Sequence, residues 1–234
     1  MSINTELIAE DLNFINLFKE VYRNNPSNDL PYHNWYHTTT MINRCYEAGL
    51  YHDLDYHALK HLCIAALFHD YDHSGGEESD SENIKRALKG IDSFFNVSIM
   101  RLTKAPYSRE IGNVDKEWIK NIVKITEFPF ISHPKTIEQK IIRDADLLQF
   151  VEEYPNEMFE GLREEISVSR GETVSRMDMC LGQLEFLLNA QFYTDWGMDL
   201  YIHCLRTWMI EVKNKLNEEI NREFENKLKS NQGV

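Results

Sequence analysis

Apolar residues recur along this chain at the three- and four-residue intervals that place them on one face of an α-helix. Hardly any stretch alternates apolar and polar residues in the manner of a half-buried strand. The sequence therefore predicts an all-α fold in which packed helices bury a shared core. The predicted helices cover residues 5–23, 33–49, 56–72, 79–88, 114–127, 135–152, 156–167, 175–192 and 197–228.

Turn-forming residues mark the breaks between these helices. A Ser-Gly-Gly triplet at 74–76 ends the third helix, and Ser79 and Glu82 have the spacing of a capping box at the start of the fourth. The stretch 92–113 is predicted to be irregular. No repeat or low-complexity linker divides the chain, so we expect one domain spanning residues 1–234.

The last predicted helix, 197–228, places several apolar residues on one face. This face would either close the helical bundle against the rest of the chain or form a seam with a second copy in a homodimer. The sequence does not decide between the two. The residues are Leu205, Met209, Val212, Leu216, Ile220 and Phe224.

Composition narrows the range of partners. Hydrophobic residues make up 42% of the 234 residues, enough for one substantial core. The formal net charge of −13 repels nucleic-acid phosphates and anionic membrane surfaces, so we expect neither as a partner. A small nucleotide substrate stays compatible with this charge, because bound divalent cations reverse the potential inside a pocket.

Cysteine usage and the N-terminus bear on the compartment. The four cysteines are widely spaced and form no CxxC pair, which is typical of buried, reduced thiols in a cytosolic protein. The first residues lack the basic and apolar stretches of a signal peptide. No apolar run approaches the roughly 20 residues of a membrane span. These features predict a soluble, cytoplasmic protein.

Histidine and aspartate residues interrupt apolar helices in three separate segments. On the predicted second helix, His33 and His37 lie four residues apart and should project from one face. His69 and Asp70 lie side by side at the end of the third helix, where both can flank one cation. His73 returns to the face of His69. Polar groups in such positions predict a site rather than a plain core.

The third segment is the 135–152 helix, in which Asp144 and Asp146 interrupt a stripe that should face the core. Burying such groups without a cation would leave uncompensated charge. Imidazole suits zinc and similar ions, whereas carboxylates and water suit magnesium or manganese. Two histidines and two aspartates therefore predict a mixed metal centre with open positions for water.

The order of these motifs, H…HD…D, resembles the signature of the HD-domain superfamily of metal-dependent phosphohydrolases. Within it, the chain is most similar to the class I cyclic-nucleotide phosphodiesterases, over about residues 25–200. Residues 31–37 (PYHNWYH) resemble their YHN-x-x-H motif, and residues 69–75 (HDYDHSG) resemble their HD-x-DH-x-G motif. Asp146 resembles the distant aspartate of their metal site, and residues 183–186 (QLEF) resemble their Q-x-x-F pair.

The resemblance implies an HD-type, phosphodiesterase-like helical bundle with two divalent metal ions. Asp70 would bridge the first ion, of Zn, Fe or Mn, to a second ion, Mg or Mn. A metal-activated hydroxide would attack phosphorus, and His33 would act as general acid on the leaving 3′ oxygen. His73 would contact the second ion's water or the phosphate. The ligands of the first ion would be His37, His69, Asp70 and Asp146.

The activity implied by the resemblance is hydrolysis of the 3′,5′-phosphodiester of a cyclic nucleotide to the 5′-monophosphate. Gln183 would hydrogen-bond the base and Phe186 would stack on it. Tyr32 and Gln149 are further candidates for substrate binding.

The chain also departs from the family pattern. Glu78 stands where the family has an asparagine, with Asn83 nearby, and the interval from Met177 to Gln183 is shorter than the family's. These departures bear on base selectivity rather than on hydrolysis.

Three other interpretations stay open. A nucleotidase, a dNTPase or a cyclic-dinucleotide hydrolase of the HD type would share the metal core without the His33 position. An HD-type diiron oxygenase would use further histidines before Asp146, where this chain has only His73 and His133 after the HD pair. A non-enzymatic acidic binding protein would be expected to have lost ligands, and none is missing. Within the site, Asp144 and Asp146 could exchange roles.

Overall fold

The structure, a computed structural model, describes residues 4–96, 104–112, 114–148 and 155–231. These residues form helices and no strand, so the all-α prediction is confirmed. The elements are α1 (Thr5–Asp11), α2 (Ile15–Asn24), α3 (Trp35–Tyr51), α4 (Tyr56–Phe68), α5 (Asp80–Phe94), α7 (Lys116–Val123), η1 (Lys124–Thr126), α8 (Ile137–Leu147), α9 (Pro155–Arg170), α10 (Arg176–Asn189) and α11 (Asp195–Asn231).

The core is centred on α4. Every residue from Leu62 to Phe68 is buried, as expected for a helix that is apolar on all its faces. Helices α3, α7, α8 and α5 pack around it, and α8 also packs on α3. Arg44 on α3 strengthens that second contact by donating to the carbonyl oxygen of Ala145 on α8, at 3.0 Å. Helix α4 is therefore packed against both α3 and α8, which also contact each other.

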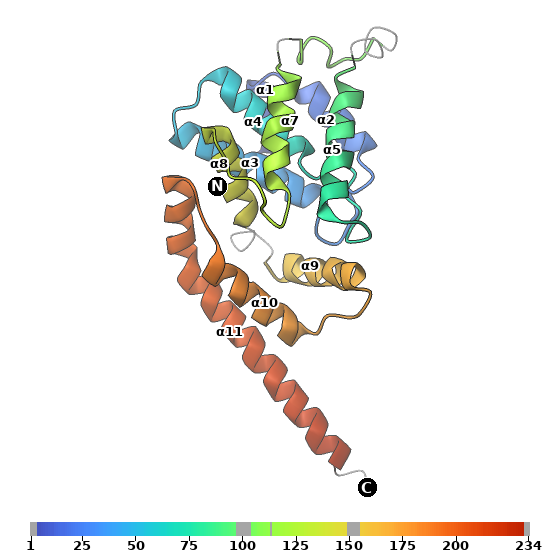
Figure 1. Cartoon of the computed structure of the whole chain (residues 1–234), viewed down its shortest axis with the longest axis vertical. Coiled ribbons are helices and arrows are strands. Elements are labelled where there is room, and N and C mark those ends of the chain that lie inside the picture. Colours follow the sequence, from blue (N-terminus) through green and yellow to red (C-terminus); the bar gives the residue numbers. More distant parts are fainter. Residues whose placement is uncertain (1–3, 97–103, 113, 149–154, 232–234) are drawn as a thin grey trace.

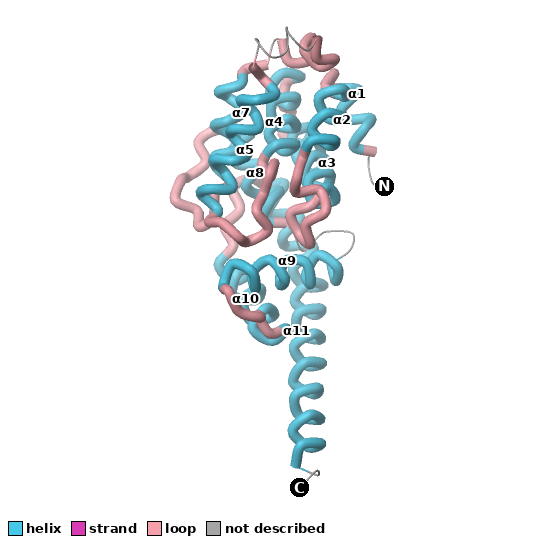
Figure 2. The backbone as a smooth tube through the Cα atoms, turned by 90° about the vertical axis from the view of Figure 1, so that its right-hand side faces the viewer, coloured by secondary structure: helices cyan, strands magenta, loops and turns pink. Residues whose placement is uncertain are grey.

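The helices form two groups in space. Helices α1 to α8 make one body, and α9, α10 and α11 lie against one end of it (Figure 1). The view from the side shows the same arrangement, with α11 extending well past the body (Figure 2). Helix α10 packs on α11, while α11 contacts α3 and α8 at its start.

The predicted apolar face of the last helix is divided between two environments. Val212 is buried, and Leu205 and Leu216 pack against the core, so this part closes the bundle on α10. Ile220 and Phe224, further along the projecting part of α11, are exposed. The homodimer seam stays a prediction for that projecting part.

The first predicted helix, 5–23, is wrong in its continuity, because the structure divides it into α1 and α2. Asn13 lies between them at a φ of 52°, a left-handed conformation that asparagine tolerates. The amide of Phe14 then donates back to the carbonyl oxygen of Ala9 at 2.7 Å, which closes the end of α1. Phe14 is fully buried, so the turn is held by the core.

Two local expectations about helix starts are also corrected. Helix α3 begins at Trp35, with Asn34 as its N-cap, so His33 lies outside the helix rather than on a face with His37. Ser79 is the N-cap of α5 but makes no side-chain capping bond, so the capping box with Glu82 does not form. The third predicted helix, 56–72, is too long, because α4 ends at Phe68 and His73 therefore lies outside it. The Ser-Gly-Gly triplet lies in the loop beyond that end, where Gly75 and Gly76 both have positive φ angles.

No helix in the described part of the chain combines the length and the apolar character that crossing a bilayer requires. The four cysteines form no disulfide; three of them are buried and Cys204 is half-buried.

Candidate metal centre

Three of the predicted metal ligands meet at the junction of α3 and α4. His37 lies on the first turn of α3, His69 is the C-cap of α4, and Asp70 follows it directly. The two Nε2 atoms of the histidines are 3.3 Å apart. The Oδ2 atom of Asp70 lies 2.9 Å from Nε2 of His69 and 3.3 Å from Nε2 of His37. Both imidazoles are almost completely buried.

The orientation of His69 is fixed by the helix it ends. Its Nδ1–H donates to the carbonyl oxygen of Ala66 at 2.8 Å, one of the last carbonyls of α4. In the neutral imidazole this places the lone pair on Nε2, which faces His37 and Asp70. A backbone carbonyl in this role is the usual partner of a metal-ligating imidazole.

The spacing of these donors fits one cation. A transition ion with ligand distances of about 2.0–2.1 Å separates neighbouring ligand atoms by about 2.9–3.4 Å. The three distances among His37, His69 and Asp70 lie within that range. Two imidazole nitrogens and a carboxylate oxygen are also a donor set that such ions favour. The residues therefore fit a bound divalent metal.

Asp146 is the fourth predicted ligand, and it faces the same group from α8. Its Oδ1 lies 3.7 Å from Nε2 of His37, and about a quarter of its side chain is exposed. Burial raises the pKa of the Asp146 carboxyl, and Asp70 adds to the rise, while His69 and His37 oppose it. Such a carboxylate is poised at the edge of the group, between the histidines and solvent.

Asp144, the other aspartate considered as a ligand, has a structural role in the fold. Its carboxylate is fully buried and accepts hydrogen bonds from the amides of Tyr193 and Thr194 and from the Thr194 hydroxyl, at 2.9, 2.8 and 2.6 Å. The same hydroxyl accepts from the amide of Gly197, so the start of α11 is fastened to α8. A Cβ at Gly197 would lie 2.5 Å from the Asp144 carboxylate. The Asp144 carboxylate therefore anchors the start of α11.

His33 lies beside the three donors, bound to a carboxylate that the sequence analysis missed. Its Nδ1 contacts Oε2 of Glu165 on α9 at 2.5 Å. Oε1 of Glu165 accepts from the amides of Tyr32 and His33, at 2.7 and 3.0 Å. Burial alone would lower the pKa of His33, but Asp70 and Glu165 outweigh it and raise that pKa. Glu165 is almost fully buried, so it holds the imidazole in one orientation.

Two glycines allow α9 to come this close. A Cβ at Gly161 would lie 2.1 Å from the carbonyl oxygen of Pro31, and one at Gly76 would lie 2.2 Å from the carbonyl oxygen of Glu165. Gly76 also has a φ of 92°, which disfavours any other residue. The sequence did carry a signal for Glu165, since it falls on the stripe of Met158, Leu162 and Ile166, where a charge is out of place.

His73 stacks on His33, with ring centroids 3.7 Å apart. The amide nitrogen of Asn83 lies 2.9 Å from its Nε2, so Asn83, rather than Glu78, fixes this ring. Burial and the charge of His33 lower the pKa of His73 to about 3. A ligand atom from each of His33, Asp70 and His73 lies within 4.8 Å of the others, which makes Asp70 common to two groups of donors.

Two residues of this centre, His33 and Asp146, line a hollow of about 410 Å³, which we call the metal hollow. Three of the predicted substrate-binding residues, Tyr32, Gln183 and Phe186, line it together with His33 and Asp146. Helices α9 and α10 form the wall opposite the metal ligands. The fourth, Gln149, lies outside the described residues.

His133, the histidine that keeps the oxygenase interpretation open, is not part of this centre. It is exposed, and it belongs to neither group of His and Asp donors found among the described residues. It lies on the 128–134 loop, away from the metal hollow.

No protein-family model matches this chain, and no curated protein matches it.

Proposed function

We propose that this protein is a metal-dependent phosphodiesterase of the HD type, which hydrolyses the 3′,5′-phosphodiester of a cyclic nucleotide to the 5′-monophosphate. One observation carries the proposal. Three metal donors (His37, His69 and Asp70) meet at one point, and Asp146, at the edge of this group, lines a hollow of nucleotide size together with a carboxylate-bound imidazole (His33).

The metal would be held by His37, His69, Asp70 and Asp146. Divalent cations supply water of lowered pKa and neutralise phosphate charge. Asp70 belongs to both donor groups, which supports a bridging place for it between two ions. A negatively charged protein gains a local cationic site in this way, so the net charge of −13 does not oppose a phosphate substrate.

His33 is suited to donate a proton to the leaving oxygen. Glu165 accepts from its Nδ1–H, which leaves Nε2 as the nitrogen that exchanges a proton with a substrate. A buried carboxylate that orients an imidazole in this manner is a common feature of general acid–base sites. The hydrogen bonds that the amides of Tyr32 and His33 donate to Glu165 hold its carboxylate in place beside the His33 ring.

The far wall of the metal hollow is suited to a base. Gln183 offers an amide that can both donate and accept, and Phe186 offers an aromatic face three residues along α10. Gln183 is nearly buried, so its amide is fixed rather than mobile in solvent. Arg170, at the end of α9, is positively charged and lines the same hollow, where it would attract an anion.

The experiment is a panel assay on the purified full chain, with Mn²⁺, Mg²⁺ or Zn²⁺ added. Substrates are 3′,5′-cyclic mononucleotides, cyclic dinucleotides and nucleoside triphosphates, with products identified by chromatography. We expect 5′-monophosphate products from the cyclic nucleotides. Nucleoside-triphosphate cleavage alone would instead favour the dNTPase interpretation. No hydrolysis with any ion would overturn the proposal.

Three variants test the assignment of roles. His37→Ala should abolish metal binding and turnover together. His33→Ala should keep metal affinity and lower turnover by about 10²–10⁴-fold, the usual contribution of a general acid. His57→Ala is the matched control, because that histidine is exposed at the start of α4 and remote from the centre. A full rate for His33→Ala would exclude the proton-donor role.

A further inference from the structure

Exposed apolar side chains gather on the last two helices, and six of them form one stripe along α11. They share a face because their positions recur at intervals close to whole turns of the helix. Three lie in the first half of α11 and three in its projecting part (Figure 2). An apolar surface of this kind marks a site of interaction with another molecule. We call it the α11 stripe: Ile202, Met209, Ile210, Ile220, Phe224 and Leu228, each between 38% and 63% exposed.

The first half of the α11 stripe borders a groove between α10 and α11. The groove has a volume of about 580 Å³, and all but two of its lining residues are aliphatic or methionine. The two exceptions, Arg206 and Lys213, are both cationic. Leu184 extends the lining onto α10, and Leu188, one turn further along that helix, is 71% exposed. The groove is thus suited to apolar side chains that have negative charges beside them.

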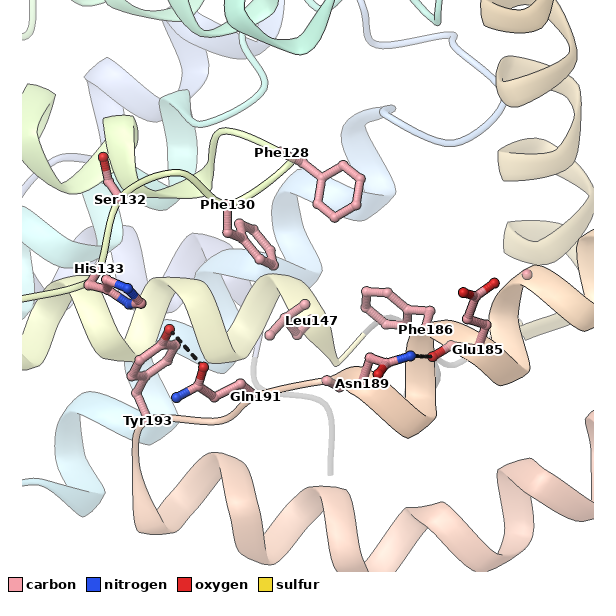
Figure 3. A pocket seen from close by; sticks show the side chains of 12 residues that line it. Phe128, Phe130, Ser132, His133, Leu147, Glu185, Phe186, Asn189, Gln191 and Tyr193 are labelled. Carbon is pink, nitrogen blue, oxygen red and sulfur yellow. Dashed lines mark hydrogen bonds between the residues drawn. The ribbon is translucent and has the colours of Figure 1, made fainter.

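Helix α10 turns a different face to the groove and to the hollows of the proposed active site. Glu185 and Phe186 line a hollow of about 450 Å³ between α10 and the loop that carries Phe128 and Phe130 (Figure 3). Leu184 lies about 200° around the helix from Phe186, on the opposite side. The groove shares no lining residue with this hollow or with the metal hollow. A partner in the groove therefore leaves both hollows open.

The α11 stripe has the same spacing before and after the middle of the helix. Ile202 and Ile210 are eight residues apart, and so are Ile220 and Leu228. At 1.5 Å per residue, each pair spans about 12 Å. Two antiparallel copies of α11 that cross at Lys215 place Ile202 opposite Leu228 of the second copy. The same crossing places Ile210 opposite Ile220, so apolar residues meet apolar residues along both halves.

Exposed charges on α11 form four blocks of alternating sign. Arg222 also lies in the third block, where it is paired with Glu219 at 2.9 Å. The order therefore reverses from one end of the helix to the other: acidic and basic before the crossing point, acidic and basic after it. The blocks are acidic (Asp195 and Asp199), basic (Arg206 and Lys213), acidic (Glu218, Glu223 and Glu225) and basic (Lys227 and Lys229).

An antiparallel copy meets these blocks with opposite charges. With the crossing at Lys215, Arg206 lies opposite Phe224 of the second copy, and thus between its Glu223 and Glu225. The acidic start of α11 likewise faces the basic end of the second helix. A parallel copy would oppose every block to itself, which is unfavourable. The charge pattern therefore favours a second copy of this chain, in antiparallel orientation, as the occupant of the groove.

We propose that this protein forms a symmetric dimer in which the projecting part of α11 lies along the groove of a second copy, antiparallel to its α11. Each copy supplies one projecting part and one groove, so the interface is closed at two chains. Figure 2 shows why the arrangement needs a second copy: this part of α11 extends past the body of its own chain. The dimer requires neither metal nor substrate, so it is independent of the proposed function.

The first test is charge reversal in the full chain, with the mass measured by light scattering over a dilution series. We expect the parent to be a dimer. Arg206→Glu, or Glu223→Arg together with Glu225→Arg, makes the attractive contacts of both halves repulsive, so the dissociation constant should rise about 10- to 100-fold. Combining all three substitutions restores opposite charges and should restore the dimer. A parent that is monomeric throughout, or a triple variant no better than the single reversals, would overturn the proposal.

The second test replaces an apolar residue of the projecting part. Phe224→Asp should give a monomer, and because Phe224 is 63% exposed the fold of the single chain should be kept, as circular dichroism can verify. Asn226→Asp is the matched control. It adds the same charge at an exposed position about 200° around α11 from Phe224, so it should stay dimeric. A dimer that persists in Phe224→Asp would refute the role of the α11 stripe.

The third test measures orientation. Asn226→Cys, on a Cys204→Ser background that leaves only the three buried cysteines, carries a nitroxide for pulsed electron paramagnetic resonance. Antiparallel helices that cross at Lys215 separate the two labels by 22 residues, or at least about 33 Å. Parallel helices would separate them by at most two helix diameters, about 24 Å. The shorter distance would reject the antiparallel interface, whereas the longer one supports it even if the protein hydrolyses nothing.

Discussion

Asp144 and Asp146 lie two residues apart, and the structure predicts opposite consequences for replacing them. Asp144→Ala removes the acceptor of three donors: the amides of Tyr193 and Thr194 and the hydroxyl of Thr194. A buried donor left without a partner costs about 1–3 kcal/mol. Water that reaches some of these donors would lower the cost, so we expect the free energy of unfolding to fall by about 3–5 kcal/mol. In a protein of this size, that corresponds to a fall in the melting temperature of about 6–20 °C.

Asp146→Ala should have the converse effect. Within the described part of the chain its carboxylate makes no comparable set of bonds, and it is partly exposed, so the metal-free variant should unfold within about 1 kcal/mol of the parent. Its affinity for Mn²⁺ should fall steeply, whereas Asp144→Ala should bind Mn²⁺ whenever it is folded.

Urea unfolding followed by circular dichroism in EDTA gives the free energies of unfolding for both variants, and calorimetric titration at low temperature gives the metal affinities. A stable Asp144→Ala protein that fails to bind Mn²⁺ would refute this assignment. An Asp146→Ala protein with parental Mn²⁺ affinity would refute it equally.

Three further predictions follow from the site. Glu165→Gln should lower kcat by about 10²-fold with Mn²⁺ affinity unchanged, because an amide hydrogen would face the ring nitrogen that the carboxylate now accepts from; a parental kcat would contradict it. Gly161→Ala should lower the free energy of unfolding by about 1–3 kcal/mol, because its methyl group meets the carbonyl oxygen of Pro31. Gly182→Ala, with open space around it, should instead gain about 0.5–1 kcal/mol in the same urea titration. Mn²⁺ at about 100 times its dissociation constant should raise the wild-type free energy of unfolding by about 2.7 kcal/mol and leave His37→Ala unchanged.

The sequence was sufficient for most of the helices, and it singled out residues that the fold brings together, because both depend on local patterns. Apolar periodicity indicated α4, and the His69-Asp70 pair at its end needs no tertiary information to be placed. His37 could be added because the sequence placed it near the start of a helix, although that helix begins at Trp35 rather than at His33. Convergence of α3, α4 and α8 then followed from packing one apolar helix among its neighbours.

The partners of these residues could not be found in the same way, because they come from distant segments. Glu165 reaches His33 from 132 residues away, and only the close approach at Gly161 and Gly76 makes that contact possible. The different roles of Asp144 and Asp146 could not be told from the sequence, because they depend on the hydrogen bond that Thr194 donates to Asp144. The break at Asn13 likewise depends on a single left-handed residue, which helical periodicity does not detect.

The residues proposed to bind metal and those proposed to bind the base come from different parts of the chain. The four proposed metal ligands lie between residues 37 and 146, in the tightly packed body, whereas Gln183 and Phe186 come from α10 in the outer group. Substitutions in α9 and α10 can therefore reshape what the cleft accepts while the cation-binding chemistry stays as it is. A lineage of such proteins could acquire new ligands by changing its last third alone.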